Sequence, residues 1–123
     1  MFALQYKSQM NKHFEIIFLK EAFEYLQSLD LKHSNKILYN IRKSQSKSDP
    51  ELFKKLTDEI WEFRTLYQGF QYRLLAFWDK TKSTDTLVIS THGFVKKQSK
   101  VPDNEILKAE TQRKKYFQDK AKN

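Results

Sequence analysis

Residues 60–78 read IWEFRTLYQGFQYRLLAFW, and this stretch decides how the rest of the chain folds. Apolar and polar side chains alternate on both sides of Gln68-Gly69, the pattern of two strands joined by a two-residue turn. Glycine suits the positive φ angle that such a turn requires. Counting back from a turn of this length places Arg64 on the first strand directly opposite Arg73 on the second.

The two faces of this predicted hairpin differ in character. One face carries mostly aromatic and aliphatic side chains, namely Trp61, Phe63, Thr65, Tyr67, Tyr72, Leu74, Ala76 and Trp78. The other face carries Glu62, Arg64, Leu66, Gln71, Arg73, Leu75 and Phe77. Like charges directly opposite each other destabilise a sheet. Two facing arginines therefore indicate a binding site for an anion such as a phosphate.

The flanking sequence predicts an α+β fold. We expect, in order, a strand at 13–18, amphipathic helices at 20–29 and 31–44 that form a hairpin, a short helical turn at 49–56, the β-hairpin, a strand at 86–94 and a C-terminal helix at 102–120. The result is a small, mostly antiparallel sheet whose hairpin belongs to a three-stranded meander. The two amphipathic helices should cover the aromatic face and leave the arginine face open.

Length and composition exclude several classes of protein. With 123 residues, the chain is expected to form a single domain, 1–123, with an irregular lead-in at 1–12. It has no cysteine, and we find neither a membrane-spanning run nor a signal-peptide core, so a cytoplasmic protein is expected. The net charge of +8 favours polyanionic partners such as nucleic acid.

RNA cleavage is a chemistry that such a chain could perform without a metal ion or cofactor, and none is expected here. The glycines are too few for a phosphate loop, and the three histidines lack metal-ligand spacing. RNA supplies its own nucleophile, the 2′-OH beside each phosphate. An enzyme must align that hydroxyl, accept its proton, stabilise the added negative charge and protonate the leaving oxygen. The planar fork of arginine is suited to holding two phosphate oxygens.

The candidate site residues follow from this chemistry. The predicted catalytic cations are Arg64, Arg73, Lys96 and Lys97, the lysines arriving at the end of the neighbouring strand. Glu62 either transfers a proton or balances the arginines. His92, placed by strand alternation on the same face as Val88 and Ser90, either transfers a proton or is a hydrogen-bonded structural residue. Contacts with RNA are expected from Lys54, Lys55, Lys100 and Tyr116.

Three motifs together resemble a known family of toxins. They are the segment from Lys55-Leu56 to Ile60-Trp61-Glu62-Phe63-Arg64, then Tyr72-Arg73-Leu74-Leu75, then His92-Gly93-Phe94-Val95-Lys96-Lys97 followed by Pro102 and a charged helix. This pattern resembles the HigB branch of the RelE/ParE toxin superfamily, which includes phage-derived toxin-like proteins. The resemblance extends over residues 13–118 and includes the order of the elements.

The resemblance implies a function and a set of partners. Toxins of this type belong to type II toxin–antitoxin systems and cleave mRNA on the ribosome by 2′-OH attack on the adjacent phosphate, without a metal ion. A small antitoxin encoded beside the toxin, often with a helix-turn-helix part, holds it inactive. Cognate antitoxin and ribosome-bound mRNA are therefore the expected partners, and a membrane is not.

The resemblance also implies roles for individual residues. Arg73 falls on a phosphate-binding arginine, and Arg64 on the arginine that ends the W-E-x-R strand. Lys96 and Lys97 fall where the family places a basic residue that stabilises the transition state. Glu62 stands where some members carry a lysine implicated in proton transfer, and this departure leaves the general base open. The aromatic residue that some relatives stack on a base corresponds to Tyr116 or Phe117.

Two other functions fit the same sequence. One is a gyrase-inhibiting toxin of the ParE type, which would affect DNA supercoiling before translation. The other is a nucleic-acid-binding module without catalysis, since a basic chain with exposed aromatic residues would serve that role. The cations focused around Arg64 and Arg73 favour the nuclease, because an inhibitor of a protein has no need to gather charge around one phosphate.

Overall fold

The fold is built on one five-stranded sheet. The computed structural model describes residues 12–82 and 86–122, so the expected lead-in lies, apart from Lys12, outside the described residues. The strands are β1 (Glu15–Phe18), β2 (Phe53–Lys55), β3 (Trp61–Tyr67), β4 (Phe70–Asp79) and β5 (Leu87–Val95), arranged in the order β1-β5-β4-β3-β2. β1 runs parallel to β5 and the other pairs are antiparallel.

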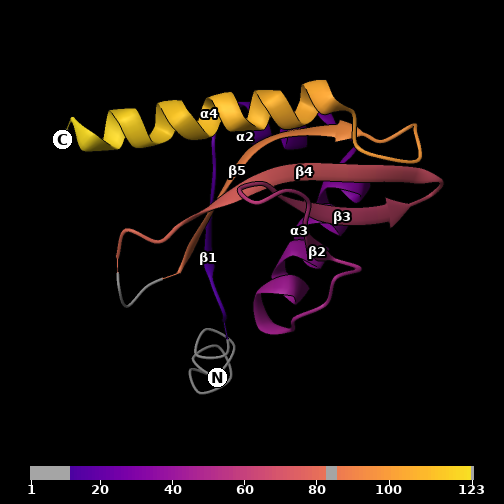
Figure 1. The fold of residues 1–123 in the computed structure, drawn as a ribbon. Coiled ribbons are helices and arrows are strands. Elements are labelled where there is room, and N and C mark those ends of the chain that lie inside the picture. The colour runs from indigo at the N-terminus through magenta and orange to yellow at the C-terminus, as the bar shows by residue number, and fades with distance from the viewer. Residues whose placement is uncertain (1–11, 83–85, 123) are drawn as a thin grey trace, which may run out of the picture.

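Helices lie on both faces of this sheet (Figure 1). The helices α2 (Lys20–Ser28) and α3 (Leu31–Ser46) cover one face, and α4 (Asp103–Ala121) covers the other. The predicted spacing explains the first pair, because α2 buries Ala22 and Leu26, and α3 buries Ile37 and Ile41. The α+β class, the two N-terminal helices, the mostly antiparallel sheet and the C-terminal helix are thus confirmed.

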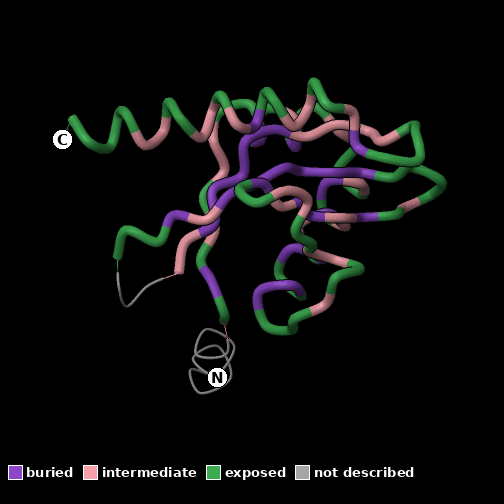
Figure 2. The backbone as a smooth tube through the Cα atoms, in the orientation of Figure 1, coloured by how far each residue is buried: buried purple, intermediate pink, exposed green. Residues whose placement is uncertain are grey.

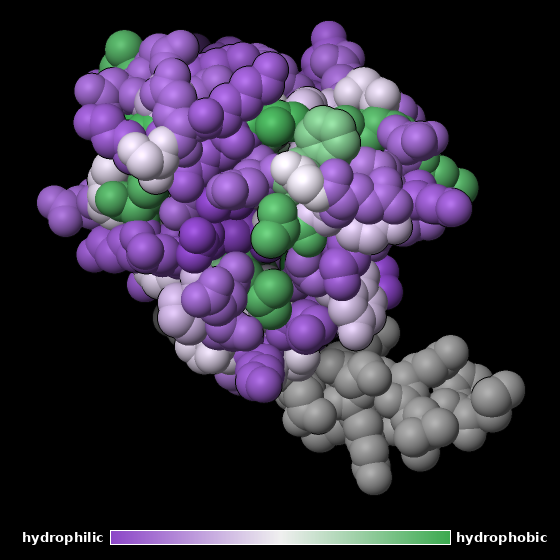
Figure 3. All heavy atoms as spheres, turned by 90° about the vertical axis from the view of Figure 1, so that its right-hand side faces the viewer, coloured by the Kyte–Doolittle hydropathy of each residue, from purple (hydrophilic) through white to green (hydrophobic). Residues whose placement is uncertain are grey.

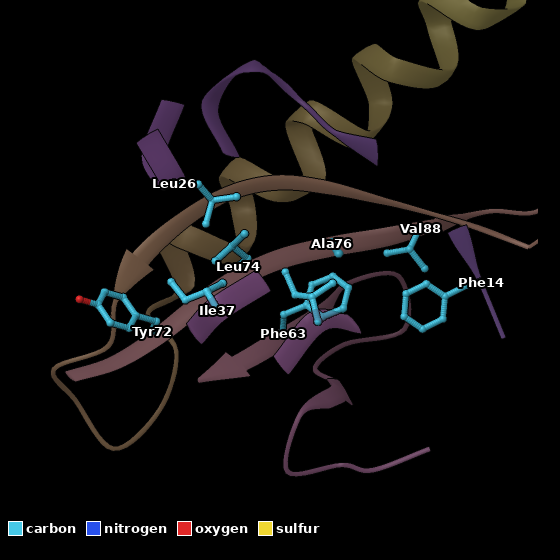
Figure 4. Packing of buried hydrophobic residues seen from close by; sticks show 9 residues of the cluster. Phe14, Leu26, Ile37, Phe63, Tyr72, Leu74, Ala76 and Val88 are labelled. Atoms are coloured by element: carbon cyan, nitrogen blue, oxygen red, sulfur yellow. The ribbon is translucent and has the colours of Figure 1, made fainter. Parts of the chain in front are cut away.

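The first hydrophobic core joins α2 and α3 to the sheet (Figure 4). Its buried members are Phe14, Leu26, Ile37, Ile41, Phe63, Tyr72, Leu74, Ala76 and Val88. The ring of Phe53 on the edge strand stacks on Phe63 with centroids 4.2 Å apart. The hairpin face predicted to receive the two amphipathic helices therefore receives them.

A second core lies on the opposite face, under α4. It contains Ile60, Leu75, Phe77, Ile89, Val101 and Ala109. The prediction that this face stays open is therefore wrong for much of its length, because Leu75 and Phe77 are apolar and bury against α4. Figure 2 shows the middle of the sheet as a continuous buried region. The arginine pair lies nearer the β3–β4 turn.

The segment predicted as a helical turn at 49–56 is a turn followed by a strand. The backbone N–H of Phe53 donates to the carbonyl of Asp49 at 3.0 Å, which closes one helical turn. From Phe53 on, the chain pairs with β3, with Phe53 opposite Phe63. Stacking of these two rings favours the extended chain over a continued helix. The meander therefore has four strands, β2 to β5, instead of three.

A β-bulge changes the orientation of His92. Leu75 pairs with His92, but the next residue, Ala76, pairs with Ser90, so Thr91 is an extra residue in β5. An extra residue reverses the alternation of side chains beyond it. His92 therefore lies on the face of Leu75 and Arg73, opposite to Ser90, and the prediction that both share a face is wrong.

Candidate functional site

The arginine pair is formed as the sequence predicts. Arg64 on β3 lies directly opposite Arg73 on β4. The register follows from the two-residue turn, in which Gln68 and Gly69 have φ angles of 49° and 84°, as two-residue hairpin turns with left-handed residues require. Phe94 on β5 continues the same row across the sheet.

Arg73 is held in place by a buried carboxylate. Its Nε atom lies 2.9 Å from Oε1 of Glu62, and the two side chains are 4% and 7% exposed. Neither atom makes a hydrogen bond, so this contact is an ion pair without hydrogen-bond alignment. The Nη1 group of Arg73 donates to the carbonyl of Tyr72 at 3.0 Å, and Nη2 donates to Oε1 of Gln71 at 3.4 Å. Glu62 thus balances Arg73, one of the two roles that the sequence left open for it.

Arg64 is more accessible than Arg73. It is half-buried, and its Nη1 group donates to the carbonyl of Pro50 at 3.3 Å. Its backbone N–H donates to the carbonyl of Leu52 at 2.8 Å. The carbonyl of Pro50 therefore fixes one side of the guanidinium, whose buried Nε atom makes no hydrogen bond to the described residues.

Lys96 completes the group of cations. It follows β5 directly, and its backbone N–H donates to the carbonyl of Gln71 at 2.7 Å. Burial lowers the pKa of its ammonium group, and the nearby charges of Arg73, Arg64 and Lys54 lower it further, whereas Glu62 opposes the shift. We call Lys54, Arg64, Arg73 and Lys96, together with Glu62, the cation cluster.

Lys54 joins this cluster because of the β2–β3 register. It lies opposite Glu62, whereas Lys55 lies opposite Trp61. Since neighbouring residues of a strand point to opposite faces, Lys55 is directed away from the cluster. The structure thus brings together Lys54, Arg64, Arg73 and Lys96 and separates Lys55 from them.

The remaining predicted cations lie in the loop after β5, and the aromatic residue lies on α4. Lys97 and Lys100 are exposed in the loop between β5 and α4. Tyr116 on α4 donates its hydroxyl to Oδ2 of Asp79 at 2.6 Å, and Asp79 ends β4 at the opposite end from the β3–β4 turn. The structure does not bring Tyr116 to the cation cluster.

His92 lies under α4 instead of at an open surface. Its Nε2 atom is 2.9 Å from Oε1 of Glu105, and its Nδ1 atom is 3.0 Å from Oγ1 of Thr91. Its side chain is 4% exposed. Burial lowers the pKa of the imidazole, although Glu105 opposes the shift. In this position, His92 ties the first turn of α4 to β5, as a hydrogen-bonded structural residue would.

Two contacts of the site were not predicted from the sequence. Gln71 falls on the arginine face of the predicted hairpin, which is the signal that could have marked it as a partner of Arg73. Pro50 contributes only a backbone carbonyl to Arg64, and a carbonyl leaves no signal in the residue type. The length of the turn before β2 decides where that carbonyl lies.

The surface at this end of the molecule is mostly hydrophilic, with small hydrophobic patches (Figure 3). Near the turn, Leu66 and Phe70 are 68% and 45% exposed. Within residues 12–82 and 86–122, no three His, Asp or Glu side chains are arranged to hold a metal ion. In the same part of the chain, no helix is long and apolar enough to cross a membrane.

These features define an α+β protein with a concentrated group of cations at one end of its sheet. Sequence comparison adds the family: the model described as "Phage derived protein Gp49-like (DUF891)" matches residues 24–114. The chain therefore belongs to this family, which is a family of HigB/RelE-like toxins. The matched region includes every member of the cation cluster. No curated protein matches the chain.

Proposed function

We propose that this protein is the toxin of a type II toxin–antitoxin system and that it cleaves mRNA on the ribosome. The observation that carries the proposal is the cation cluster, in which Arg73 pairs with one buried carboxylate and the charges of Arg73, Arg64 and Lys54 act on Lys96. Such a concentration of positive charge is unfavourable for folding alone, and binding of a phosphate would relieve it. Membership of a HigB/RelE-like toxin family supports the same reading.

The cleavage step uses the 2′-OH of the RNA as nucleophile. Its oxygen forms a bond to phosphorus, the bond to the 5′ oxygen breaks, and the products are a cyclic phosphate and a 5′-hydroxyl. Arg64, which is the more accessible arginine, holds the non-bridging oxygens and stabilises the added charge. Arg73 contributes its positive charge from beneath, fixed by Glu62 and Gln71.

Lys96 is suited to act as the general acid that donates a proton to the leaving 5′ oxygen. A lysine with a lowered pKa gives up its proton more readily than an ordinary lysine, and burial, together with the charges of Arg73, Arg64 and Lys54, lowers the pKa of Lys96. The proton of the attacking hydroxyl goes to a base, for which Glu62 is the carboxylate within the cluster. Its ion pair with Arg73 would have to loosen for Glu62 to act in that way.

Induced expression tests the proposal. Arg64→Ala and Lys96→Ala should each abolish growth inhibition and mRNA cleavage on programmed ribosomes, because each removes a cation that would contact the scissile phosphate. Lys114→Ala, which changes an exposed lysine of α4, is the matched control and should stay toxic. Cleavage that persists in both cluster variants would contradict the proposal, and loss of DNA supercoiling before translation would favour a gyrase inhibitor.

The antitoxin is proposed to be the product of the adjacent reading frame, a small protein with a helix-turn-helix part. Co-expression of that product should restore growth. The Lys96→Ala variant should still bind it, because removal of one cation from the cluster leaves the fold and the rest of the surface unchanged.

A further inference from the structure

A pocket lies beside the end of β4 that is far from the β3–β4 turn. β3 begins at Trp61, which pairs with Ala76, whereas β4 continues to Asp79. The last residues of β4 therefore extend beyond the start of β3, and the pocket next to them has a volume of about 600 Å³. A pocket of this size is typical of a site for a small molecule or for one unit of a larger one.

Three aromatic rings line this pocket. Trp61 and Trp78, the two tryptophans of the chain, meet edge to face with their ring centroids 5.7 Å apart. Both also pack on Phe53, at 4.9 Å and 5.8 Å between centroids, and both stay partly exposed. Phe117 of α4 is the third ring, and it is partly exposed as well. We call this site, lined by Trp61, Trp78 and Phe117, the aromatic pocket.

Two cations lie over rings of the aromatic pocket. The Nζ atom of Lys80 is 5.5 Å from the centre of the Trp78 ring, and the guanidinium carbon of Arg113 is 5.1 Å from the centre of the Phe117 ring. Both distances are within the range of cation–π contacts. Lys80 is exposed, so its flexible side chain can reach a negative group of any ligand that contacts the rings.

The remaining charged side chains leave the pocket weakly basic. Lys55, which the β2–β3 register turns away from the cation cluster, is part of the lining. Asp58 and Glu59 also line the pocket, and Glu59 pairs with Arg113 at 3.0 Å. Three cations against two carboxylates give the lining a net charge of +1.

This lining selects among the possible occupants. An apolar segment of protein is disfavoured, because five of the nine lining residues are charged. A cationic ligand is disfavoured as well, because Lys80 and Arg113 already lie over the ring faces. Double-stranded nucleic acid keeps its bases inside the helix, where the rings do not reach them. An unpaired base with its phosphate suits both parts of the lining, since the base stacks on a ring and the phosphate meets the lysines.

We infer that the aromatic pocket is a second binding site for single-stranded RNA, in which the rings stack on an unpaired base while Lys55 and Lys80 hold the neighbouring phosphates. This inference rests on the proposed function for the choice of RNA, and it gives that substrate a contact outside the cation cluster. The pocket and the cluster share no residue, so each can be tested while the other is intact.

Tryptophan fluorescence measures this binding directly, because both tryptophans of the chain line the pocket. The probe is a single-stranded RNA of about six nucleotides, within the range that such sites cover. It carries 2′-O-methyl groups in place of the 2′-OH, so it lacks the nucleophile for cleavage, and it is titrated into the full chain without ribosomes. The emission should be quenched as a base stacks, and the affinity should fall as salt rises. A duplex of the same sequence should quench far less.

Two variants that spare the fold test the contacts. Lys80→Glu changes an exposed side chain, and Phe117→Leu keeps an apolar side chain in the second core but removes the aromatic face. Each should weaken binding of the probe at least about fivefold, the low end of what one stacked base contributes. The matched controls are Lys32→Glu on α3 and Phe23→Leu on α2, both exposed and outside the pocket, and their affinity should stay within about twofold of the wild type.

Lys55→Ala gives a further check on the separation of the two sites. It should weaken binding of the probe, because it removes a phosphate contact. It should leave the pH dependence of RNA cleavage in place, because Lys55 lies outside the cation cluster.

Several results would overturn the inference. They are a wild-type emission that the single strand does not quench at low salt, equal quenching by the duplex, and unchanged affinity in both Lys80→Glu and Phe117→Leu. Quenching that disappears in Lys96→Ala would assign the signal to the cation cluster instead. If the pocket variants lose affinity as expected but Lys96→Ala and Arg64→Ala stay toxic, the proposed function fails while the binding site stands.

Discussion

The Nε atom of Arg73 lies 2.9 Å from Oε1 of Glu62, with both side chains more than nine-tenths buried. This ion pair is what allows two arginines to face each other on neighbouring strands, because the carboxylate offsets their repulsion. Arg73 is thereby a buried and fixed part of the site, whereas Arg64 and Lys96 are the more accessible cations of the site. The pair therefore links the stability of the hairpin to the charge of the site.

Replacement of Glu62 by glutamine should destabilise the protein strongly. Gln keeps the shape of the side chain but leaves the Arg73 guanidinium buried without a counter-ion, a loss that costs about 3–5 kcal/mol. The free energy of unfolding in urea at pH 7 measures this cost. Glu24→Gln, at an exposed position of α2, is the control and should change stability by less than about 0.5 kcal/mol. Equal stability of the two variants would mean that the ion pair contributes nothing.

The arginine pair could be predicted because its determinants are local. A two-residue turn and strict alternation decide which residues face each other, and both are visible in the sequence around Gly69. Lys96 was predicted for the same reason, since it follows a strand whose register with β4 is continuous at that end. The positions of the two arginines and of Lys96 thus follow from the turn and from side-chain alternation along the strands.

The features that could not be predicted depend on contacts between distant segments. The bulge adds Thr91 to β5 as an extra residue, and nothing in the amino-acid types of this strand indicates where a bulge lies. The bulge reverses the face on which His92 lies. Helix α4 covers Leu75 and Phe77 through packing that the sequence of the hairpin does not specify. Asp49-Pro50 signals a helix start, but the stacking of Phe53 on Phe63 ends that turn and begins β2.

The pH dependence of RNA cleavage should report on Lys96. A general acid must be protonated, so the rate should fall as pH rises through its pKa, and this fall should begin at lower pH than for an ordinary lysine. Lys96→Arg keeps the charge but donates a proton poorly, so the rate should drop by about 10²–10⁴-fold and the high-pH decline should disappear. The measurement is the rate of cleavage on programmed ribosomes against pH.

Lys54→Ala provides the complementary test of the same electrostatic effect. It removes a cation that lowers the pKa of Lys96, so the high-pH decline should move to higher pH. Lys55→Ala is the matched control, because the β2–β3 register directs Lys55 to the other face. An unchanged profile in the Lys54 variant would show that Lys96 is not the titrating group.

Asp79 should control the stability of the protein in acid. Burial alone would raise the pKa of this carboxyl, but hydrogen bonds from Lys120, Tyr116 and Thr81 outweigh burial and hold the pKa well below its ordinary value. A lowered pKa contributes stability that is present above the pKa of the unfolded chain, about 3.9. This contribution is lost as pH falls towards the folded value.

Asp79→Asn should therefore lower the free energy of unfolding at pH 7 by about 2 kcal/mol, as expected for loss of hydrogen bonds to a charged group. As pH falls from about 4 to about 2, through and below the ordinary carboxyl pKa of about 3.9, the variant should also lose less stability than the wild type. Asp119→Asn, whose pair with Lys115 is exposed, should cost about 0.5 kcal/mol or less. Parallel acid curves for the Asp79 variant and the wild type would contradict this role.

Gly93 should accept a side chain only at a cost in stability, because the ring of Tyr25 lies against it. A Cβ atom at this position would lie 2.5 Å from Cδ2 of the Tyr25 ring, which packs on β5 from α2. Gly93→Ala should therefore destabilise the protein by about 1–3 kcal/mol, measured by urea unfolding, through forced displacement of the ring. Gly69→Ala is the comparison, since its φ of +84° imposes strain but no atom lies within 4 Å of the added carbon.

In a double-mutant cycle, Tyr25→Ala should remove most of the cost of Gly93→Ala while leaving that of Gly69→Ala unchanged. Additive effects of the Tyr25 and Gly93 changes would instead assign the cost to the backbone of β5.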